Sequence, residues 1–210
     1  MRVYIACALL EAIPSAPSWV NRNQVQIATN ARLISAQSPN LNYKELLLEA
    51  ISEFKTKWRF ISLYRVLEHG YLSEIFQTLT NSFFSAPKDS LKVAAESVQN
   101  ELMQFVSFAE AASLQNQFEA LYDEFELVKN AGNQFALALE HSIQQGGQQT
   151  QTKNRWQAGV LVCYKIRCAI VHAGLSAPVY DVYPDGPALL EALLPTFEFV
   201  ALTFLGVTVL

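Results

Sequence analysis

The sequence predicts a mainly α-helical bundle with a short β appendage near the N-terminus. Of the 210 residues, 51% are hydrophobic and 16% are charged, which is typical of a folded domain with a large buried surface. From Asn42 onward, apolar residues recur at the i, i+3, i+4 spacing of amphipathic helices. Only residues 2–8 and 25–29 resemble short strands. We therefore divide the chain into an appendage, residues 1–40, and a helical domain, residues 41–210.

The first two helices are predicted from caps and periodicity. Asn42 fits the N-cap of a helix over 43–55, and a longer helix is expected over 58–84, ended by Pro87. The longer helix carries a core-facing stripe made of Ile61, Tyr64, Leu67, Tyr71, Leu72, Ile75, Phe76 and Leu79.

Turn residues and caps predict the remaining elements. They are, in order, a helix over 91–112 capped by Ser90, helices over 113–130 and 135–144, a polar loop over 144–154, a helix over 155–172 between Asn154 and Gly174, an extended piece over 179–183, and a final helix opened by Asp185-Gly-Pro187 and kinked at Pro195.

Two apolar segments resemble membrane or export signals. Residues 1–16 loosely imitate a secretory signal, but Glu11 directly follows a short apolar run, so we expect a buried strand or helix there. Residues 189–210 are long enough to span a bilayer, but Glu191 and Glu198 would be costly inside it, which favours a buried helix or an oligomer interface. We expect a cytoplasmic protein with reduced thiols and no membrane partner.

Arg167 and His172 are the leading candidates for a functional site. They lie in Tyr164-Lys-Ile-Arg-Cys-Ala-Ile-Val-His, near the end of an almost wholly apolar helix, where polar groups need dedicated partners. Arginine binds phosphate through a planar fork, and histidine changes charge near neutral pH. Asp and Glu are absent from residues 141–180, a window that contains four Lys or Arg, so an anionic partner is expected to bind there.

This stretch resembles the Arg-x(4–6)-His motif of HEPN domains, and residues 58–72 resemble the first long core helix of the Apea-like branch of that family. The resemblance covers about residues 43–205 and implies a helical bundle that dimerises, with Arg and His of both protomers lining one cleft. It implies metal-independent cleavage of RNA with no cofactor, in which Arg167 holds the phosphate and His172 acts as general base or acid. Such proteins are similar to toxins and antiphage effectors, so RNA, a second copy and an antitoxin or partner effector are the expected partners.

Cys168 departs from the family pattern, which usually has a polar residue, often Asn, directly after the Arg. A thiol is a poor substitute for the hydrogen bonds of an amide. The alternative is therefore a non-catalytic module that binds RNA or a nucleotide, or that serves as a scaffold in a larger assembly.

Several nearby side chains are further candidates. Lys165 and Arg155 would contact substrate phosphates or be solvated positions on the motif helix. Glu68 is the best candidate to pair with a motif residue from a neighbouring helix, and Tyr164 would stack on a base or fill the core. Arg65 and His69 resemble a polar edge, and His141 is expected to be exposed. The sequence has neither a Gly-rich phosphate loop nor a metal-ligand cluster.

Overall fold

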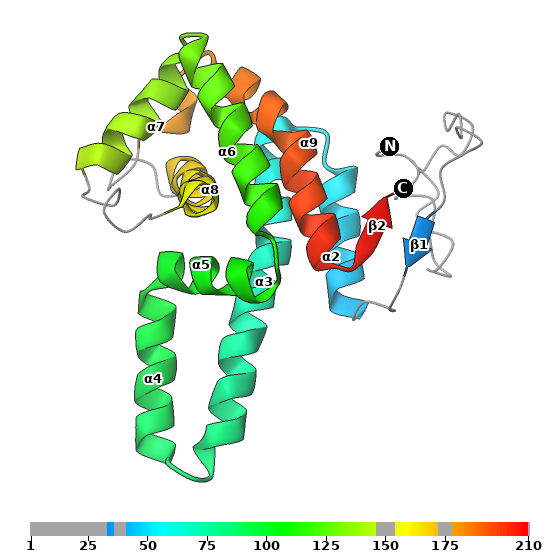
Figure 1. Cartoon of the computed structure of the whole chain (residues 1–210), viewed down its shortest axis with the longest axis vertical. Coiled ribbons are helices and arrows are strands. Elements are labelled where there is room, and N and C mark those ends of the chain that lie inside the picture. The colour runs from blue at the N-terminus through cyan, green and yellow to red at the C-terminus, as the bar shows by residue number, and fades with distance from the viewer. Residues whose placement is uncertain (1–32, 36–40, 146–153, 172–177, 210) are drawn as a thin grey trace.

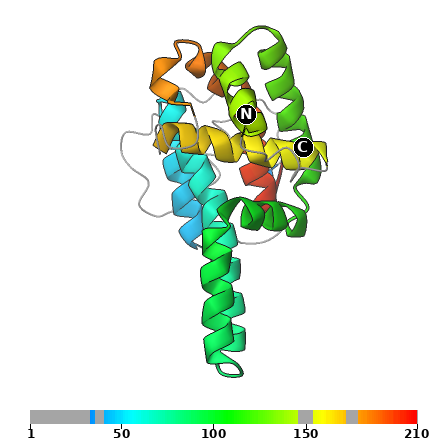
Figure 2. The same ribbon diagram turned by 90° about the vertical axis from the view of Figure 1, so that its left-hand side faces the viewer.

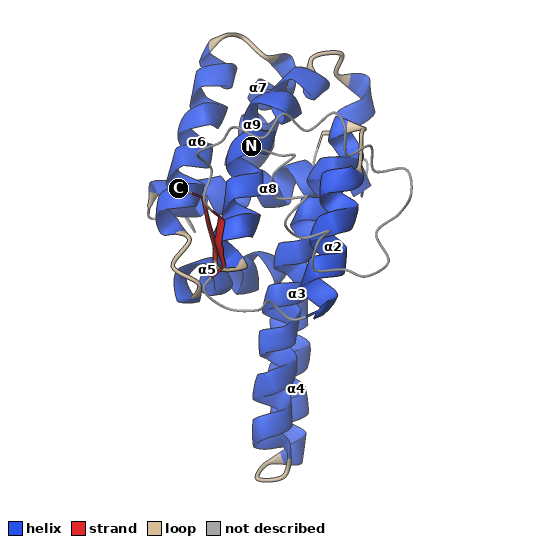
Figure 3. Ribbon diagram, turned by 90° about the vertical axis from the view of Figure 1, so that its right-hand side faces the viewer, coloured by secondary structure: helices blue, strands red, loops and turns tan. Residues whose placement is uncertain are grey.

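The structure, a computed structural model, describes residues 33–35, 41–145, 154–171 and 178–209. These ranges form eight α-helices, one 3₁₀ turn and two short strands, which confirms the mainly α prediction (Figures 1 and 3). The elements are β1 (Leu33–Ser35), α2 (Leu41–Ser52), α3 (Thr56–Phe83), α4 (Pro87–Gln99), α5 (Glu101–Ala111), α6 (Gln115–Asn130), α7 (Gln134–Gln145), α8 (Arg155–Val171), the 3₁₀ turn (Tyr180–Val182), α9 (Gly186–Phe204) and β2 (Val207–Val209).

The core of the bundle lies where α3, α6, α8 and α9 pack together, and α8 runs across the other helices (Figure 2). Aromatic rings fill much of this core, for example Phe60 stacked on Phe197 with ring centroids 4.6 Å apart. Helix α9 is long and apolar enough to cross a membrane. Its leucines and Phe197 are nevertheless buried against the other helices, as expected for a core helix.

The second half of α3 and the whole of α4 leave the bundle as a protruding two-helix hairpin (Figures 1 and 2). We call residues 72–99 the arm. Its turn follows Phe83, and Pro87 begins α4 because proline lacks the N–H that the first helical position leaves unpaired.

Strand β1 pairs antiparallel with β2, with Leu33 opposite Val209. Helix α9 ends because Gly206 adopts a φ of +70°, and the β-prone Val207–Val209 follows it. Helix α9 therefore stops before residues 207–209, which belong to the apolar segment 189–210 that was predicted to be a buried helix or an oligomer interface. The strands predicted over residues 2–8 and 25–29 lie outside the described residues.

Two predicted caps are wrong, because Asn42 lies inside α2 and Ser90 lies inside α4. The predicted helix over 91–112 is two helices, broken at Asn100, where φ is −102° and ψ is 51°. The Asn100 side chain donates to the carbonyl of Glu96 at 3.2 Å, a bond that competes with continuation of the helix.

Two further predictions differ from the structure. Residues 179–183 contain a 3₁₀ turn in place of an extended piece. In the predicted core stripe of α3, Leu72 and Phe76 are 42% and 68% exposed, because the helix has left the bundle at that point. The polar loop beyond residue 145 and the predicted cap Gly174 fall outside the described residues.

Candidate functional site

Helix α8 is buried on almost every side, which explains its apolar sequence. Its buried positions are Gly159, Val160, Leu161, Val162, Cys163, Lys165, Ile166, Cys168, Ala169 and Ile170. A Cβ atom at Gly159 would lie 2.1 Å from the carbonyl oxygen of Phe118, so only glycine permits this close approach of α8 to α6. The helix is therefore a rigid support for the side chains near its end.

Arg167 lies near the C-terminal end of α8, with 17% of its side chain exposed. Its Nη2 atom is 3.5 Å from Oε1 of Glu68, and its Nη1 atom is 3.6 Å from Oε2 of Glu101. The guanidinium also lies over the ring of Tyr64, at 5.7 Å from the centroid. The partner predicted from the sequence, Glu68, is thus present, and Glu101 is a second carboxylate that the sequence analysis did not identify.

Glu101 is the centre of a small polar network. Its Oε1 accepts hydrogen bonds from the hydroxyls of Tyr71 at 3.1 Å and Tyr64 at 3.4 Å. Glu101 is also the first residue of α5, where the helix dipole favours a negative charge. The carboxylate of Glu101, on α5, is therefore held in place by two tyrosines of α3 before it contacts Arg167 on α8.

The pKa values of this network follow from burial and from the two carboxylates. Burial lowers the pKa of Arg167, but attraction from Glu101, Tyr64 and Glu68 outweighs it, and the pKa is raised above the usual arginine value. Burial, followed by repulsion from Glu101, raises the pKa of Tyr71 well above that of a free phenol. At neutral pH the site therefore contains a charged guanidinium beside neutral phenols.

Arg167 lines an open groove of about 450 Å³. The groove is formed by α2, α3 and the end of α8, and its lining residues are Glu49, Glu53, Trp58, Ile61, Ser62, Tyr64, Arg65, Glu68, Arg167 and Val171. Two arginines thus face three glutamates, with two aromatic rings alongside. With only two cations in this lining, it suits a single phosphate better than a long polyanion, and Trp58, which is 46% exposed, offers a surface on which a base can stack.

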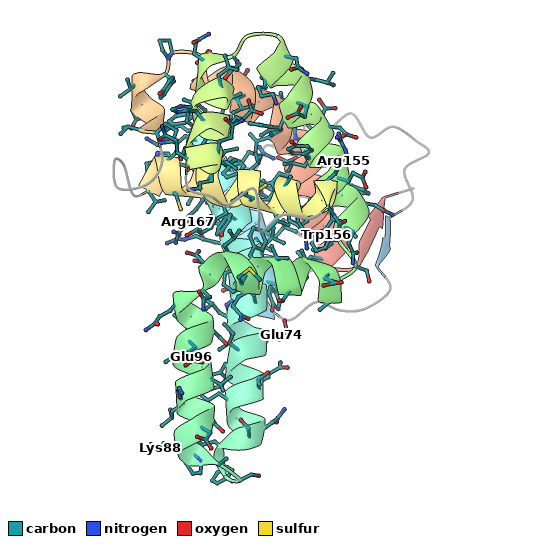
Figure 4. The ribbon with its side chains drawn as sticks, turned by 60° about the vertical axis from the view of Figure 1, so that its left-hand side comes forward. Glu74, Lys88, Glu96, Arg155, Trp156 and Arg167 are labelled. Carbon is teal, nitrogen blue, oxygen red and sulfur yellow. The ribbon has the colours of Figure 1, made fainter. Side chains whose placement is uncertain are left out.

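The other predicted site residues that the structure describes, Lys165, Arg155 and Cys168, do not line the groove. Lys165 is 3% exposed, so it is a buried residue and not a solvated position on α8. Arg155 lies at the opposite end of α8 (Figure 4), about 18 Å away by helix rise, and pairs with Asp123. Cys168 is buried next to Arg167, and burial raises the pKa of its thiol. His172 lies outside the described residues.

Of the other candidate residues, Arg65 lines the groove, whereas His69 and His141 do not. Arg65 is exposed and belongs to the groove lining, whereas His69 packs edge-on against Tyr43 with ring centroids 4.9 Å apart. His141 is exposed, as predicted. In the part of the chain that the structure describes, His, Cys, Asp and Glu do not form any group of three placed to hold a metal ion.

Glu101 and the contribution of α2 to the groove were not predicted from the sequence. The one available signal for Glu101 was its isolation, because it is the single acidic residue between Glu96 and Glu110. Glu49 and Glu53 gave no signal, since they resemble ordinary solvated positions of a helix.

No family model, curated protein or solved structure matches this chain.

Proposed function

We propose that the Arg167 groove binds a phosphodiester of RNA and that the chain is a metal-independent endoribonuclease of the HEPN type. The observation that carries the proposal is the charged guanidinium of Arg167. It lies at the edge of an open groove and is fixed to a rigid buried helix. In the sequence, His172 follows Arg167 by five residues. The protein is expected to act in the cytoplasm as a toxin or an antiphage effector, restrained by an antitoxin or a partner effector.

In the proposed reaction His172 accepts the proton of the ribose 2′-hydroxyl, and the 2′-oxygen attacks the adjacent phosphorus. The bond from phosphorus to the 5′-oxygen breaks, and a protonated imidazole donates a proton to that oxygen. The products are a 2′,3′-cyclic phosphate and a 5′-hydroxyl. Arg167 would stabilise the charge that develops on the non-bridging oxygens. In a homodimer, the two copies of His172 would divide the roles of base and acid.

The carboxylates beside Arg167 support binding of one phosphate. Glu68 and Glu101 contact the guanidinium at 3.5 and 3.6 Å, longer than the ~2.7–2.9 Å of tight charge-assisted hydrogen bonds. An incoming phosphate can therefore replace one of these contacts while the other still orients Arg167. Because few cations face the groove, we expect a weak salt dependence, with a slope of about −0.7 to −1.4 in log Kobs against log salt for one or two phosphate contacts.

The test is cleavage of a labelled mixed-sequence RNA in excess EDTA by the wild type, Arg167→Ala and His172→Ala. We expect each of these substitutions to lower the rate by about 100-fold or more, because transition-state stabilisation or proton transfer is lost. The matched controls are Arg155→Ala, at the far end of the same helix, and His141→Ala, at an exposed histidine. Both controls should cleave at nearly the wild-type rate and leave cyclic phosphate ends.

Absence of cleavage by the folded wild type, or full cleavage by Arg167→Ala, would overturn the nuclease proposal. Arg167→Lys adds a further check, because it keeps the charge but removes the planar fork. If Arg167 grips a phosphate through that fork, Arg167→Lys should stay close to the activity of Arg167→Ala.

A second candidate function is RNA or nucleotide binding without cleavage, or a scaffold role in a larger assembly. The observation that favours it is the pairing of Arg167 with two carboxylates beside a buried Cys168, where the family usually has an amide. Fluorescence anisotropy with a 2′-O-methyl RNA distinguishes the two functions. Binding that depends on Arg167, together with intact natural RNA, would support the second candidate.

A further inference from the structure

The arm exposes apolar side chains on both of its helices. On α3 these are Leu72, Phe76 and Phe83, and on α4 they include Leu91 and Val98, which are 53% and 57% exposed. On each helix the spacing is that of a coiled-coil seam. Leu72, Phe76 and Phe83 are spaced by four and seven residues, and positions 91, 95 and 98 follow a 4-3 pattern.

The interior of the arm is poor in apolar contacts. Where the two helices face each other, Ile75, Leu79 and Ser82 of α3 lie opposite Ser90, Ala94 and Ser97 of α4. A cavity of about 160 Å³ lies between them. Ser90 is the single buried residue that α4 contributes. A hairpin with so little core of its own resembles half of a four-helix bundle.

Most of the exposed apolar residues of the two helices lie on the same side of the arm; the exception is Val93, which is 53% exposed. Glu74 and Thr78 of α3 line the cavity together with Val93 of α4, so these three residues share one side. Two residues along a helix point about 200° apart, because one residue turns the helix by about 100°. Phe76, two residues after Glu74, and Leu91, two residues before Val93, therefore both point to the other side.

We call this other side the arm face; its residues are Leu72, Phe76, Phe83, Leu91, Ala95 and Val98. The same geometry keeps the acidic residues of the arm off the arm face. The three acidic residues of the arm, Glu74, Asp89 and Glu96, lie about 140–180° from the centre of the face on their own helices. Lys88, at the tip of the arm (Figure 4), precedes Leu91 by three residues and therefore lies beside the tip end of the arm face. Lys92, one residue after Leu91, points about 100° away from Leu91.

We propose that the arm face docks onto the arm face of a second copy of this chain, so that two arms form a four-helix bundle. An apolar face whose charge is confined to one lysine at its tip is complementary to itself under two-fold symmetry, whereas a nucleic acid or an acidic peptide would find only that lysine to pair with. The exposed side chains offer on the order of 500 Å² per arm, and two arms reach the ~1,000 Å² that a specific interface needs. This proposal does not rest on the role of Arg167.

The test is sedimentation velocity of the full chain over a concentration series. The wild type should sediment as a dimer, at twice the 23.5 kDa of one chain. The double variant Phe76→Glu/Val98→Glu should raise the dimer dissociation constant by about 100-fold or more, because association would bury unpaired carboxylates. The matched control, Gln77→Glu/Gln99→Glu, adds the same charge at the neighbouring exposed positions and should remain dimeric.

Circular dichroism of both variants should equal that of the wild type, because all four positions are exposed. A wild type that stays monomeric at every concentration would overturn the proposal. So would a dimer that Phe76→Glu/Val98→Glu leaves intact, since the chains would then associate through another surface, which the nuclease proposal permits. A monomer that floats with phosphatidylcholine–phosphatidylglycerol vesicles, and stops floating in the double variant, would assign the arm face to a lipid surface instead.

Discussion

The bundle and the arm share one helix but are held together in different ways. In the bundle, Phe105 contacts Tyr64 and Phe118 with ring centroids 5.2 and 5.6 Å apart, and all three side chains are buried. In the arm, α3 contributes no buried residue after Tyr71, and the helices meet through small side chains. The apolar stripe of α3 continues across this boundary. Helical periodicity therefore tells which side of a helix will be covered, but not what covers it.

The largest expected effect compares one residue type in the two regions. Phe105→Ala should lower the free energy of unfolding by about 3–5 kcal/mol, because it leaves a cavity among packed rings. Phe76→Ala should change it by less than about 0.5 kcal/mol, because this ring is exposed in the single chain. Urea unfolding at concentrations that keep the chain monomeric measures both. Similar losses for the two variants would mean that the arm is packed as tightly as the bundle.

The next effect tests the closest approach between helices in the bundle. Gly159→Ala should cost about 1–3 kcal/mol, because its Cβ would meet the backbone carbonyl of Phe118, and the helices must separate. Gly70→Ala should cost less, because its Cβ meets the rings of Phe108 and Phe204, which can rotate away. Thermal unfolding of the two variants provides the comparison. A milder loss at Gly159 than at Gly70 would show that α8 is free to shift against α6.

The sequence predicted most helices because their periodicity and punctuation are local. The break at Asn100 was missed because Leu102 and Phe105 continue the apolar pattern across it. Pro87 was interpreted as the end of one helix, although it also starts the next. The exposure of Phe76 was missed for a different reason, since leaving the bundle is a property of the tertiary arrangement and has no local signal.

The candidate site was predicted in part. The isolated Arg167 in an apolar helix required a partner, and Glu68 was identified from its place on a neighbouring helix. Glu101 and the groove lining from α2 were not predicted, because they reach the site only after four separate helices pack together. Arg155 shares the basic window with Arg167 in the sequence but lies at the other end of the same helix.

A smaller effect appears at alkaline pH. Burial, followed by repulsion from Cys168, raises the pKa of Tyr164 from 10.0 to about 12. The folded chain thus holds this proton more tightly than the unfolded chain, and the stabilisation is complete below pH 10 and lost as the pH rises through 12. As the pH rises through this range, the free energy of unfolding of the wild type should fall by about 1 kcal/mol more than that of Tyr164→Phe, after allowance for partial exposure. Urea titrations of the wild type and the variant at pH 9 to 12 measure it, and parallel curves would contradict the shift.

The smallest effect compares two lysines, one in each region. Burial lowers the pKa of Lys165, so at neutral pH its charge favours the unfolded chain, and this cost fades as the pH rises toward the ordinary lysine value of 10.5. Lys165→Met removes this cost and should therefore raise the free energy of unfolding at pH 7. Lys92→Met, at an exposed position of the arm, should leave it unchanged within about 0.5 kcal/mol.

The Lys165→Met variant also tests whether that cost has a function. A stabilised chain that cleaves or binds RNA as well as the wild type would make Lys165 a tolerated buried charge. A stabilised chain that loses cleavage or binding would mean that the buried ammonium contributes to the site, because a protein retains a destabilising charge where its function needs it.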